Sequence, residues 1–589
     1  MKKLARKGLS WMLALCMTLS LLPMTAMAAD DAAPPEGKTP AELLAAMTLD
    51  QKIGQMIMPD FRKWKSTGAS LEANVTEIND EIVDIIDKYD FGGVILFAEN
   101  VVGTEQTRRL TTQLQSAALK DKGEEGAPAI PMFLTIDQEG GIVYRLGTGT
   151  ALPGNMAIGA TRSAEMAEQV GQIIGRELNS LGINVNFAPS VDVNNNPLNP
   201  VIGLRSVSSD PNLVAQLTVP MIRGMNEYNI ASAAKHFPGH GDTANDSHSK
   251  LPVVDKSFDQ LKATELVPFK AAVEAGVDML MTAHIAYPQI DDTTIPTKAD
   301  PNVRFPIPCT LSKTVIKKLA REYLNYDGVI VTDAMNMAAI SDNIGQAQAV
   351  VMVFQAGIDI ALMPVIPRTT AQATADLDAV FAAVKKAIND GELTIAQIDK
   401  SVTRILELKK ARGLLDAEYP AENSEAFNAQ LAAANAQVGS KQNRKLERDI
   451  AAAAITVVKN ENNLLPIKPK AGETVLFFTP YDNEVDSIKL GVERAKADGA
   501  IPSSIAYEVL RTDYNSSFTG TLSSALKAKL DTATYVVVVS ETTAAGMGGG
   551  LGKYVKAVTA YTKTKNIPSV VATISQPYDL ANYPDATAL

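Results

Sequence analysis

The hydrophobic positions of this 589-residue chain form short, nearly continuous runs separated by longer amphipathic stretches. Runs that are apolar along their whole length are typical of parallel strands buried on both faces. The gaps between them hold helical patterns, for example at residues 163–181 and 258–275. Repeated strand–helix units of this number and spacing predict a (β/α)8 barrel. The eight runs cover residues 55–58, 93–97, 132–136, 184–188, 231–234, 277–282, 329–332 and 358–363.

A second, smaller α/β unit is predicted after an Ala-, Asn- and Gln-rich linker at residues 415–445. We therefore expect a barrel over residues 39–414 and an α/β sandwich domain over residues 446–589. The sequence ends at Leu589 soon after a predicted strand, which leaves open whether the second unit has all its elements. Its strand-like runs lie at residues 474–478, 504–509, 535–540 and 569–574, and its helical patterns include 522–530 and 553–563.

Residues 1–28 have the pattern of a secretory signal peptide, with four basic residues, an apolar run at 9–23 and small residues at 25–29. An uncleaved membrane anchor is the alternative, but the run is short for a span. A Pro-rich leader follows at residues 29–38. The later sequence has no stretch of 18 or more apolar residues. We expect a secreted or extracytoplasmic protein whose mature chain has no membrane span, with or without attachment to the cell wall.

Composition narrows the possible partners. The formal charge of −11 becomes −15 without the signal peptide, which carries four positive charges and no negative one. Such a chain has no bulk basic surface for phosphates, so nucleic acid is not an expected partner. Its two cysteines, Cys16 and Cys309, exclude a disulfide scaffold and a multi-cysteine metal site.

Titratable side chains follow the predicted strands at the end where barrel enzymes carry their chemistry. Each of them alone could instead cap a helix or satisfy a buried hydrogen-bonding group. Their recurrence at one end of apolar strands favours a functional site. They are Asp137 and Glu139, Asp192, Lys235 and His236, His284, and Asp333.

The loop after the fifth strand holds three of the four histidines of the chain, His236, His240 and His248. Its Pro238 and Gly239 are typical of a loop with unusual backbone angles. These two residues also break any helical face that a His-x3-His-x7-His zinc site would need. Zinc binding and a purely structural role for the histidines remain the alternatives. We expect no metal or cofactor.

Asp246 precedes His248 by two residues, so its carboxylate is placed to polarise the imidazole. A carboxylate-paired histidine is a good general acid and base near neutral pH.

The segment Lys-His-Phe-Pro-Gly-His-Gly-Asp-Thr at residues 235–243, followed by Asp-Ser-His at 246–248, resembles the signature of glycoside hydrolase family 3. More narrowly, it is similar to the branch of exo-acting β-N-acetylglucosaminidases that use a His–Asp dyad. The resemblance covers about residues 48–415, with a weaker echo at 457–466. Supporting segments lie at residues 137–141, 186–189, 192–193, 202–206 and 331–335.

The resemblance implies a role for each candidate residue. Asp333 matches the nucleophile that forms a covalent glycosyl-enzyme, and His248, paired with Asp246, matches the acid/base. A histidine acid avoids the repulsion that a second carboxylate would meet beside Asp333. Glu139 is a rival acid, although its glycine neighbours favour a supporting position. The residues that match sugar-binding positions are Asp137, Arg145, Arg205, Lys235 and His236; the cations among them have structural ion pairs as an alternative.

The sequence therefore predicts a retaining exo-β-N-acetylglucosaminidase that removes terminal β-linked GlcNAc from peptidoglycan-derived muropeptides or related glycosides. Its partner is a carbohydrate. The alternatives are a β-glucosidase or phosphorylase of the same family, or a non-catalytic glycan-binding protein. The aglycone and the oligomeric state are left open.

Overall fold

The computed structural model describes residues 39–120, 128–244, 246–247, 251–512, 518–542, 549–574, 577 and 582–589. The predicted signal peptide and Pro-rich leader, and His248, lie outside the described residues. No helix in these described ranges combines the length and apolar character that a membrane span requires.

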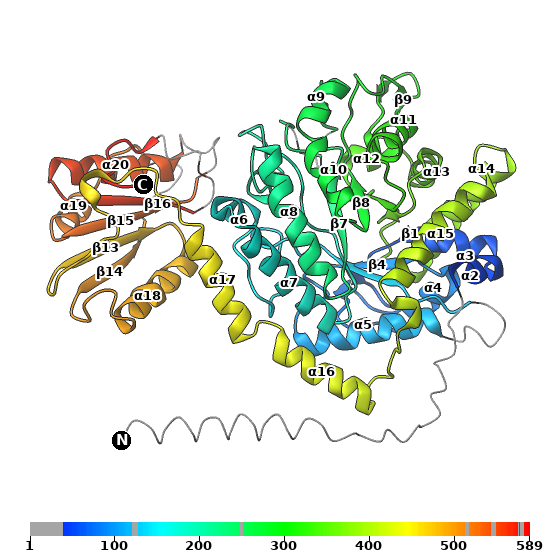
Figure 1. Ribbon diagram of the computed structural model, residues 1–589, viewed down its shortest axis with the longest axis horizontal. Helices are drawn as coiled ribbons and strands as arrows, with labels where there is room; N and C mark the ends of the chain where they lie inside the picture. Colours follow the sequence, from blue (N-terminus) through cyan, green and yellow to red (C-terminus); the bar gives the residue numbers. More distant parts are fainter. Residues whose placement is uncertain are drawn as a thin grey trace, which may run out of the picture. The chain divides into compact units, whose positions relative to one another are not determined.

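Within the described part of the chain, strand pairings and isolated bridges join eight parallel strands into a ring, which confirms the predicted barrel. Figure 1 shows helices arranged around these strands. Neighbours along the chain pair in sequence order from β4 to β11, and β1 pairs with β12. The bridges Asp60–Ile95 and Val331–Ile360 close the two remaining seams. The strands are β1 (Ile57–Met58), β4 (Gly93–Leu96), β5 (Phe133–Ile136), β6 (Val185–Asn186), β7 (Ala231–Phe237), β8 (Met279–Thr282), β11 (Val329–Thr332) and β12 (Ala361–Leu362).

Helices cover the outside of the ring and connect successive strands. In α4 (Asp80–Tyr89) the buried residues recur at helical spacing, and Asn79 caps the first turn by accepting the N–H of Ile82. The other barrel helices are α2 (Pro40–Ala46), α3 (Leu49–Gln55), α5 (Thr104–Leu119), α6 (Asn155–Thr161), α7 (Ala164–Ser180), α8 (Pro211–Asn226), α9 (Phe258–Ala263), α10 (Leu266–Glu274), α11 (Lys313–Val315), α12 (Ala338–Ser341), α13 (Gln346–Ala356), α14 (Thr370–Asn389) and α15 (Ile395–Ala411).

The helix predicted over residues 258–275 is two helices, α9 and α10, which meet at Thr264 and Glu265. Glu265 is buried, and its carboxylate accepts hydrogen bonds from Lys256 and Asn195. The chain turns between the two helices, and the carboxylate of Glu265 lies in the interior. Amphipathic periodicity does not predict this break.

Smaller elements decorate the barrel. The antiparallel pair β9 (Thr294–Pro296) and β10 (Arg304–Pro306) lies between β8 and β11, and β2 (Lys63–Trp64) pairs with β3 (Ala73–Asn74) after β1. A π-helical turn covers Ile316–Tyr323.

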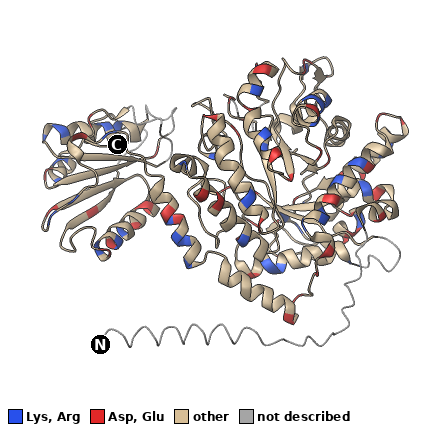
Figure 2. Cartoon of the chain, in the orientation of Figure 1, with Lys and Arg blue, Asp and Glu red and all other residues tan. Residues whose placement is uncertain are grey.

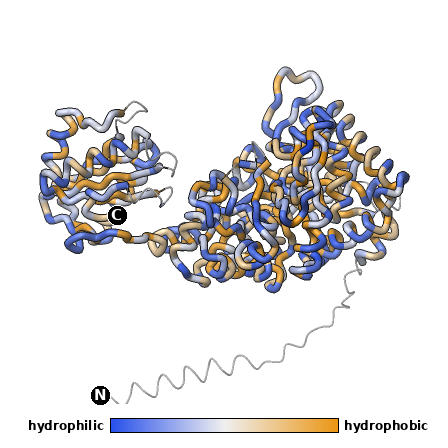
Figure 3. Tube along the Cα trace, turned by 90° about the horizontal axis from the view of Figure 1, so that it is seen from above, coloured by the Kyte–Doolittle hydropathy of each residue, from blue (hydrophilic) through white to orange (hydrophobic). Residues whose placement is uncertain are grey.

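The residues of β4, β5, β8 and β11 are all buried, as the apolar runs predicted. Figure 3 shows hydrophobic stretches alternating with hydrophilic ones along the tube. In Figure 2, Lys and Arg lie interspersed with Asp and Glu on the outer helices, whereas the strands are mostly uncharged.

The segment after the barrel forms α16 (Glu425–Gln437) and α17 (Lys441–Ala453). Its Ala434, Val438 and Ile450 belong to the same buried cluster as the barrel core. On α7, the carboxylate of Glu177 accepts hydrogen bonds from the N–H of Gly439 and the side-chain amide of Asn443, both at 2.9 Å. The linker is therefore attached to the barrel by apolar and polar contacts.

The C-terminal unit is the predicted smaller α/β domain. Its strands form a parallel sheet in the order β14-β13-β15-β16, with its own apolar core. Figure 1 shows α18 on one side of the sheet and α19 and α20 on the other. The strands are β13 (Thr474–Thr479), β14 (Ala506–Arg511), β15 (Tyr535–Ser540) and β16 (Ser569–Thr573), and the helices are α18 (Asp482–Ala497), α19 (Ser524–Leu530) and α20 (Gly550–Thr564).

The side chain of Lys409 on α15 is fully buried in the barrel. Its Nζ donates to Oε1 of Gln55 at 2.7 Å and lies 5.0 Å from the ring centroid of Phe133. Burial pushes the pKa of Lys409 well below its usual value. Between the lowered pKa and the unfolded value of roughly 10.4, the unfolded state binds the extra proton, so this group makes stability rise with pH.

We expect Lys409→Met to remove that pH dependence. The free energy of unfolding of the wild type, relative to the variant, should increase with pH above the lowered pKa of Lys409, by at most about 1.4 kcal/mol per pH unit. Urea unfolding, followed by the fluorescence of Trp64, measures this free energy for the barrel, because Trp64 is the one tryptophan after residue 28. Lys410→Met, at an exposed neighbouring position that pairs with Asp416, is the control and should show no such trend. A constant difference between wild type and Lys409→Met would contradict a neutral buried amine.

Candidate active site

The polar side chains at the carboxyl ends of the strands meet in one pocket of about 650 Å³. Parallel strands of a barrel all end at the same rim, which explains why residues 200 positions apart become neighbours. Asp246 is described and half-buried but does not line the pocket, and His248 is outside the described residues. The candidate residues from the sequence that line it are Asp137, Glu139, Arg145, Arg205, Lys235, His236 and Asp333.

Asp333 follows β11 directly and keeps part of its surface open to the pocket. Its N–H donates to the carbonyl oxygen of Thr282, and its Oδ1 accepts the N–H of Ala334 at 2.7 Å. Burial opposes ionisation of Asp333, but the imidazoles of His236 and His284, the N–H of Ala334 and the ammonium of Lys235 favour it, so its pKa lies below the ordinary value. The group is an oriented carboxylate at neutral pH.

Glu139 and Lys235 form the centre of a buried ion cluster. Lys235 Nζ lies 2.7 Å from both Asp137 Oδ1 and Glu139 Oε1. Arg205 binds Glu139 through two nitrogens, at 2.7 and 3.0 Å. Burial opposes the charge of Glu139, yet Arg205 and Lys235 outweigh it and hold its pKa far below the usual range. Glu139 has no proton to donate at working pH, which disfavours it as the acid.

The ion cluster continues to His236 on β7. Arg205 Nη2 lies 3.1 Å from His236 Nε2, and His236 Nδ1 lies 2.7 Å from Asp192 Oδ2. Because a guanidinium only donates, Nε2 is the acceptor and Nδ1 carries the proton that faces Asp192. The imidazole is thereby held in one tautomer at the pocket wall.

Asp192 also fixes the start of the loop that follows β7. Its carboxylate accepts the backbone N–H of His236 at 3.2 Å and that of His240 at 2.6 Å. Gly239 lies between them with φ +137°, and a Cβ there would come within 2.7 Å of the Glu265 side chain. The predicted unusual backbone of this loop is confirmed at that glycine.

His284, left open by the sequence, contacts the backbone next to Asp333. It is fully buried, with Nε2 2.9 Å from the carbonyl oxygen of Ala334 and Nδ1 2.8 Å from the hydroxyl of Thr310. Its contact is with the backbone next to Asp333, which favours a supporting role.

The sequence analysis missed Arg62 and Phe97, which also line the pocket. The guanidinium of Arg62 lies 3.5 Å from the ring centroid of Phe97, and that of Arg145 lies 5.9 Å from it. Both residues follow the first two strands of the barrel closely, so the strand-end rule used for the later strands would have found them.

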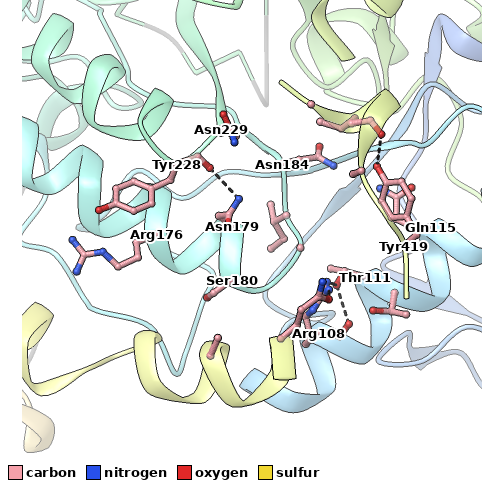
Figure 4. A pocket seen from close by; sticks show the side chains of 18 of the residues that line it. Arg108, Thr111, Gln115, Arg176, Asn179, Ser180, Asn184, Tyr228, Asn229 and Tyr419 are labelled. Carbon is pink, nitrogen blue, oxygen red and sulfur yellow. Dashed lines mark hydrogen bonds between the residues drawn. The ribbon is translucent and has the colours of Figure 1, made fainter. Parts of the chain in front are cut away.

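A second pocket, of about 760 Å³, lies where β6 and β7 begin (Figure 4). Figure 4 shows amides, hydroxyls and arginines around it, among them Arg108, Arg176 and Asn179. Among its described lining residues the single carboxylate is Glu418, and none is a histidine. Glycoside cleavage needs two titratable groups flanking one bond, so the smaller pocket is the candidate active site. The described residues contain no group of three or more His, Cys, Asp or Glu that could hold a metal ion.

Comparison with known proteins agrees with this geometry. Residues 48–408 match the family described as "Glycosyl hydrolase family 3 N terminal domain". Beta-hexosaminidase A of Pseudoalteromonas piscicida is 41% identical over 72% of this chain and 69% of its own length. A beta-N-acetylglucosaminidase/beta-glucosidase of Cellulomonas fimi is 30% identical over 66% of this chain and 62% of its own length.

Among solved structures, a glycoside hydrolase family 3 beta-N-acetylglucosaminidase from Paenibacillus sp. str. FPU-7 superposes with a TM-score of 0.71 and 31% identity. The similarity covers 92% of this chain and 93% of that one. The family match over residues 48–408 and the identity to the relatives define the class of the protein. The chain belongs to glycoside hydrolase family 3, and it is a glycosidase.

We expect Glu139→Gln to weaken the ion cluster without removing the acid. The change leaves Lys235 and Arg205 undercompensated, so the free energy of unfolding should fall by about 3 kcal/mol. kcat/KM should fall as Lys235 and Arg205 shift in the pocket wall, while the shape of the pH–rate profile is kept, because Glu139 does not titrate there. Glu274→Gln, in an exposed pair with Lys270, is the control and should change stability by less than about 0.5 kcal/mol. A lost basic limb in the pH profile of Glu139→Gln would instead identify Glu139 as the acid.

Proposed function

We propose that the protein is a retaining exo-β-N-acetylglucosaminidase that hydrolyses terminal β-linked GlcNAc from peptidoglycan-derived muropeptides or related amino-sugar glycosides. The observation that carries the proposal is Asp333, an ionised carboxylate oriented by the N–H of Ala334 in a pocket with Asp137 and Lys235. The β-hexosaminidase and β-N-acetylglucosaminidase relatives support the sugar class.

In the first step, a carboxylate oxygen of Asp333 bonds to the anomeric carbon while the bond from that carbon to the aglycone oxygen breaks. His248 gives its proton to the leaving oxygen, and Asp246 stabilises the imidazolium. In the second step, water attacks the anomeric carbon, His248 takes a proton from it, and the Asp333 carboxylate is released. Configuration is retained because the anomeric carbon is inverted twice.

The charges in the pocket suit a neutral sugar. Lys235 and Arg205 are balanced by Asp137 and Glu139 at hydrogen-bond distance. Each of these groups has further donor or acceptor capacity for sugar hydroxyls and an acetamido group, and bonds to ionised partners are stronger than neutral ones. The imidazole of His236, whose Nε2 is hydrogen-bonded to Arg205, forms part of the pocket wall in a fixed orientation.

Export is part of the proposal. The signal-peptide pattern of residues 1–28 and the acidic mature chain favour an extracytoplasmic enzyme that recognises its glycan locally and not by bulk charge.

Asp333→Asn should abolish turnover of an aryl β-GlcNAc substrate. Removing the nucleophile eliminates the covalent route, so we expect kcat to fall by roughly four orders of magnitude or more. Asp327→Asn, at the opposite end of β11 where the side chain is 80% exposed, is the matched control. Mass spectrometry of the wild type trapped with a 2-acetamido-2-deoxy-sugar that forms a slow glycosyl-enzyme should place the label on Asp333. A label on another residue would overturn the assignment.

His248→Ala should be selective for the leaving group. On N,N′-diacetylchitobiose, whose leaving group needs a proton, kcat/KM should fall roughly 10²–10⁴-fold. On 2,4-dinitrophenyl β-GlcNAc, whose leaving group is stable as an anion, the fall should be far smaller. kcat/KM is the right measure because it reports the first chemical step. Equal losses on both substrates would exclude His248 as the acid.

A further inference from the structure

His240 forms side-chain hydrogen bonds to two other residues of the loop that follows β7. It is buried, with 1% of its surface exposed. Its Nδ1 lies 2.9 Å from the hydroxyl of Thr243, and its Nε2 lies 3.1 Å from the hydroxyl of Ser247. A neutral imidazole donates from one nitrogen and accepts at the other, and a hydroxyl does either, so both bonds form together.

The backbone of His240 is itself fixed to the barrel. Its N–H donates to Asp192 Oδ1 at 2.6 Å, and its carbonyl oxygen accepts the side-chain amide of Asn199 at 2.7 Å. Asp192 is fully buried and also binds His236. The backbone of His240 is therefore held on the barrel, and its Nε2 is hydrogen-bonded to the hydroxyl of Ser247, seven residues further along the loop.

Its surroundings keep the imidazole uncharged. Burial lowers the pKa of His240 to about 4, and the neighbouring His236 acts in the same direction, although Asp192 acts in the opposite direction. Above that pH the ring stays a neutral bridge and does not act as a proton donor of its own.

We propose that His240 is a positioning residue, which sets the place of the acid/base at residue 248 through its bond to Ser247. This inference rests on the proposed role of His248. Ser247 is the immediate neighbour of that residue, and displacement of a reacting group by about 1 Å is enough to cost 10²-fold in rate.

Two variants remove the same hydrogen bond from opposite sides. Ser247→Ala deletes the hydroxyl, and His240→Asn keeps an amide near the Nδ1 position but has nothing at Nε2. On N,N′-diacetylchitobiose we expect kcat/KM to fall about 10- to 100-fold in each, and on 2,4-dinitrophenyl β-GlcNAc less than about threefold. The double variant should lose no more than either single one, because both remove one interaction.

The matched control is His240→Gln, whose side-chain amide reaches the Nε2 position. It should recover most of the activity on chitobiose, within about fivefold of wild type, because the bond to Ser247 is restored. A purely structural role would show equal losses on both substrates, or no rescue by glutamine, and either result overturns the inference. Trp64 fluorescence in urea checks folding, and if His240→Asn does not fold, Ser247→Ala alone decides.

His248→Ala, assayed beside them, separates this inference from the proposed function. If His248→Ala is selective for the leaving group while Ser247→Ala and His240→Asn match wild type, the positioning role alone is wrong. If His248→Ala loses equally on both substrates, the acid assignment fails and the positioning role fails with it.

Discussion

The architecture of the site depends on one buried carboxylate, Asp192. It accepts the N–H groups of His236 and His240 and the Nδ1–H of His236. An ionised carboxylate without exposure is tolerated only when nearly every lone pair is used. Burial raises the pKa of Asp192, but interactions with His236 and His240 lower it more, so the carboxylate stays charged. Its hydrogen bonds then hold the loop after β7 against the barrel.

Around Asp192 the pocket is assembled as a chain of hydrogen bonds and ion pairs. His236 connects it to Arg205, Arg205 to Glu139, Glu139 to Lys235, and Lys235 to Asp137. Each member compensates the next, which allows several ionised groups to be buried together at the barrel rim. The sugar-binding and ion-pair interpretations of the cations are therefore compatible, because the same bonds that bury the cations also aim them.

Most of the fold was predictable because parallel strands in a barrel are apolar along their length, and their order in the sequence is their order in the ring. The same rule located Asp137, Lys235 and Asp333. It did not reveal the break at Glu265, whose carboxylate is satisfied by partners outside both helices, Lys256 and Asn195. Nor did spacing show that Glu139 stays ionised, because its pKa depends on Arg205 and Lys235, which come from other parts of the sequence.

The attachment of the linker to the barrel has a consequence for the smallest self-sufficient piece of this enzyme. Glu177 has 2% of its surface exposed, and two of the groups that satisfy its carboxylate, the N–H of Gly439 and the amide of Asn443, come from beyond the last barrel helix. Ile450 adds a fully buried side chain to the same core. A chain cut directly after the barrel would leave a buried charge with fewer partners and an uncovered apolar patch. As a folding unit, the barrel therefore extends to the end of α17, about forty residues past the point where its strand–helix pattern stops.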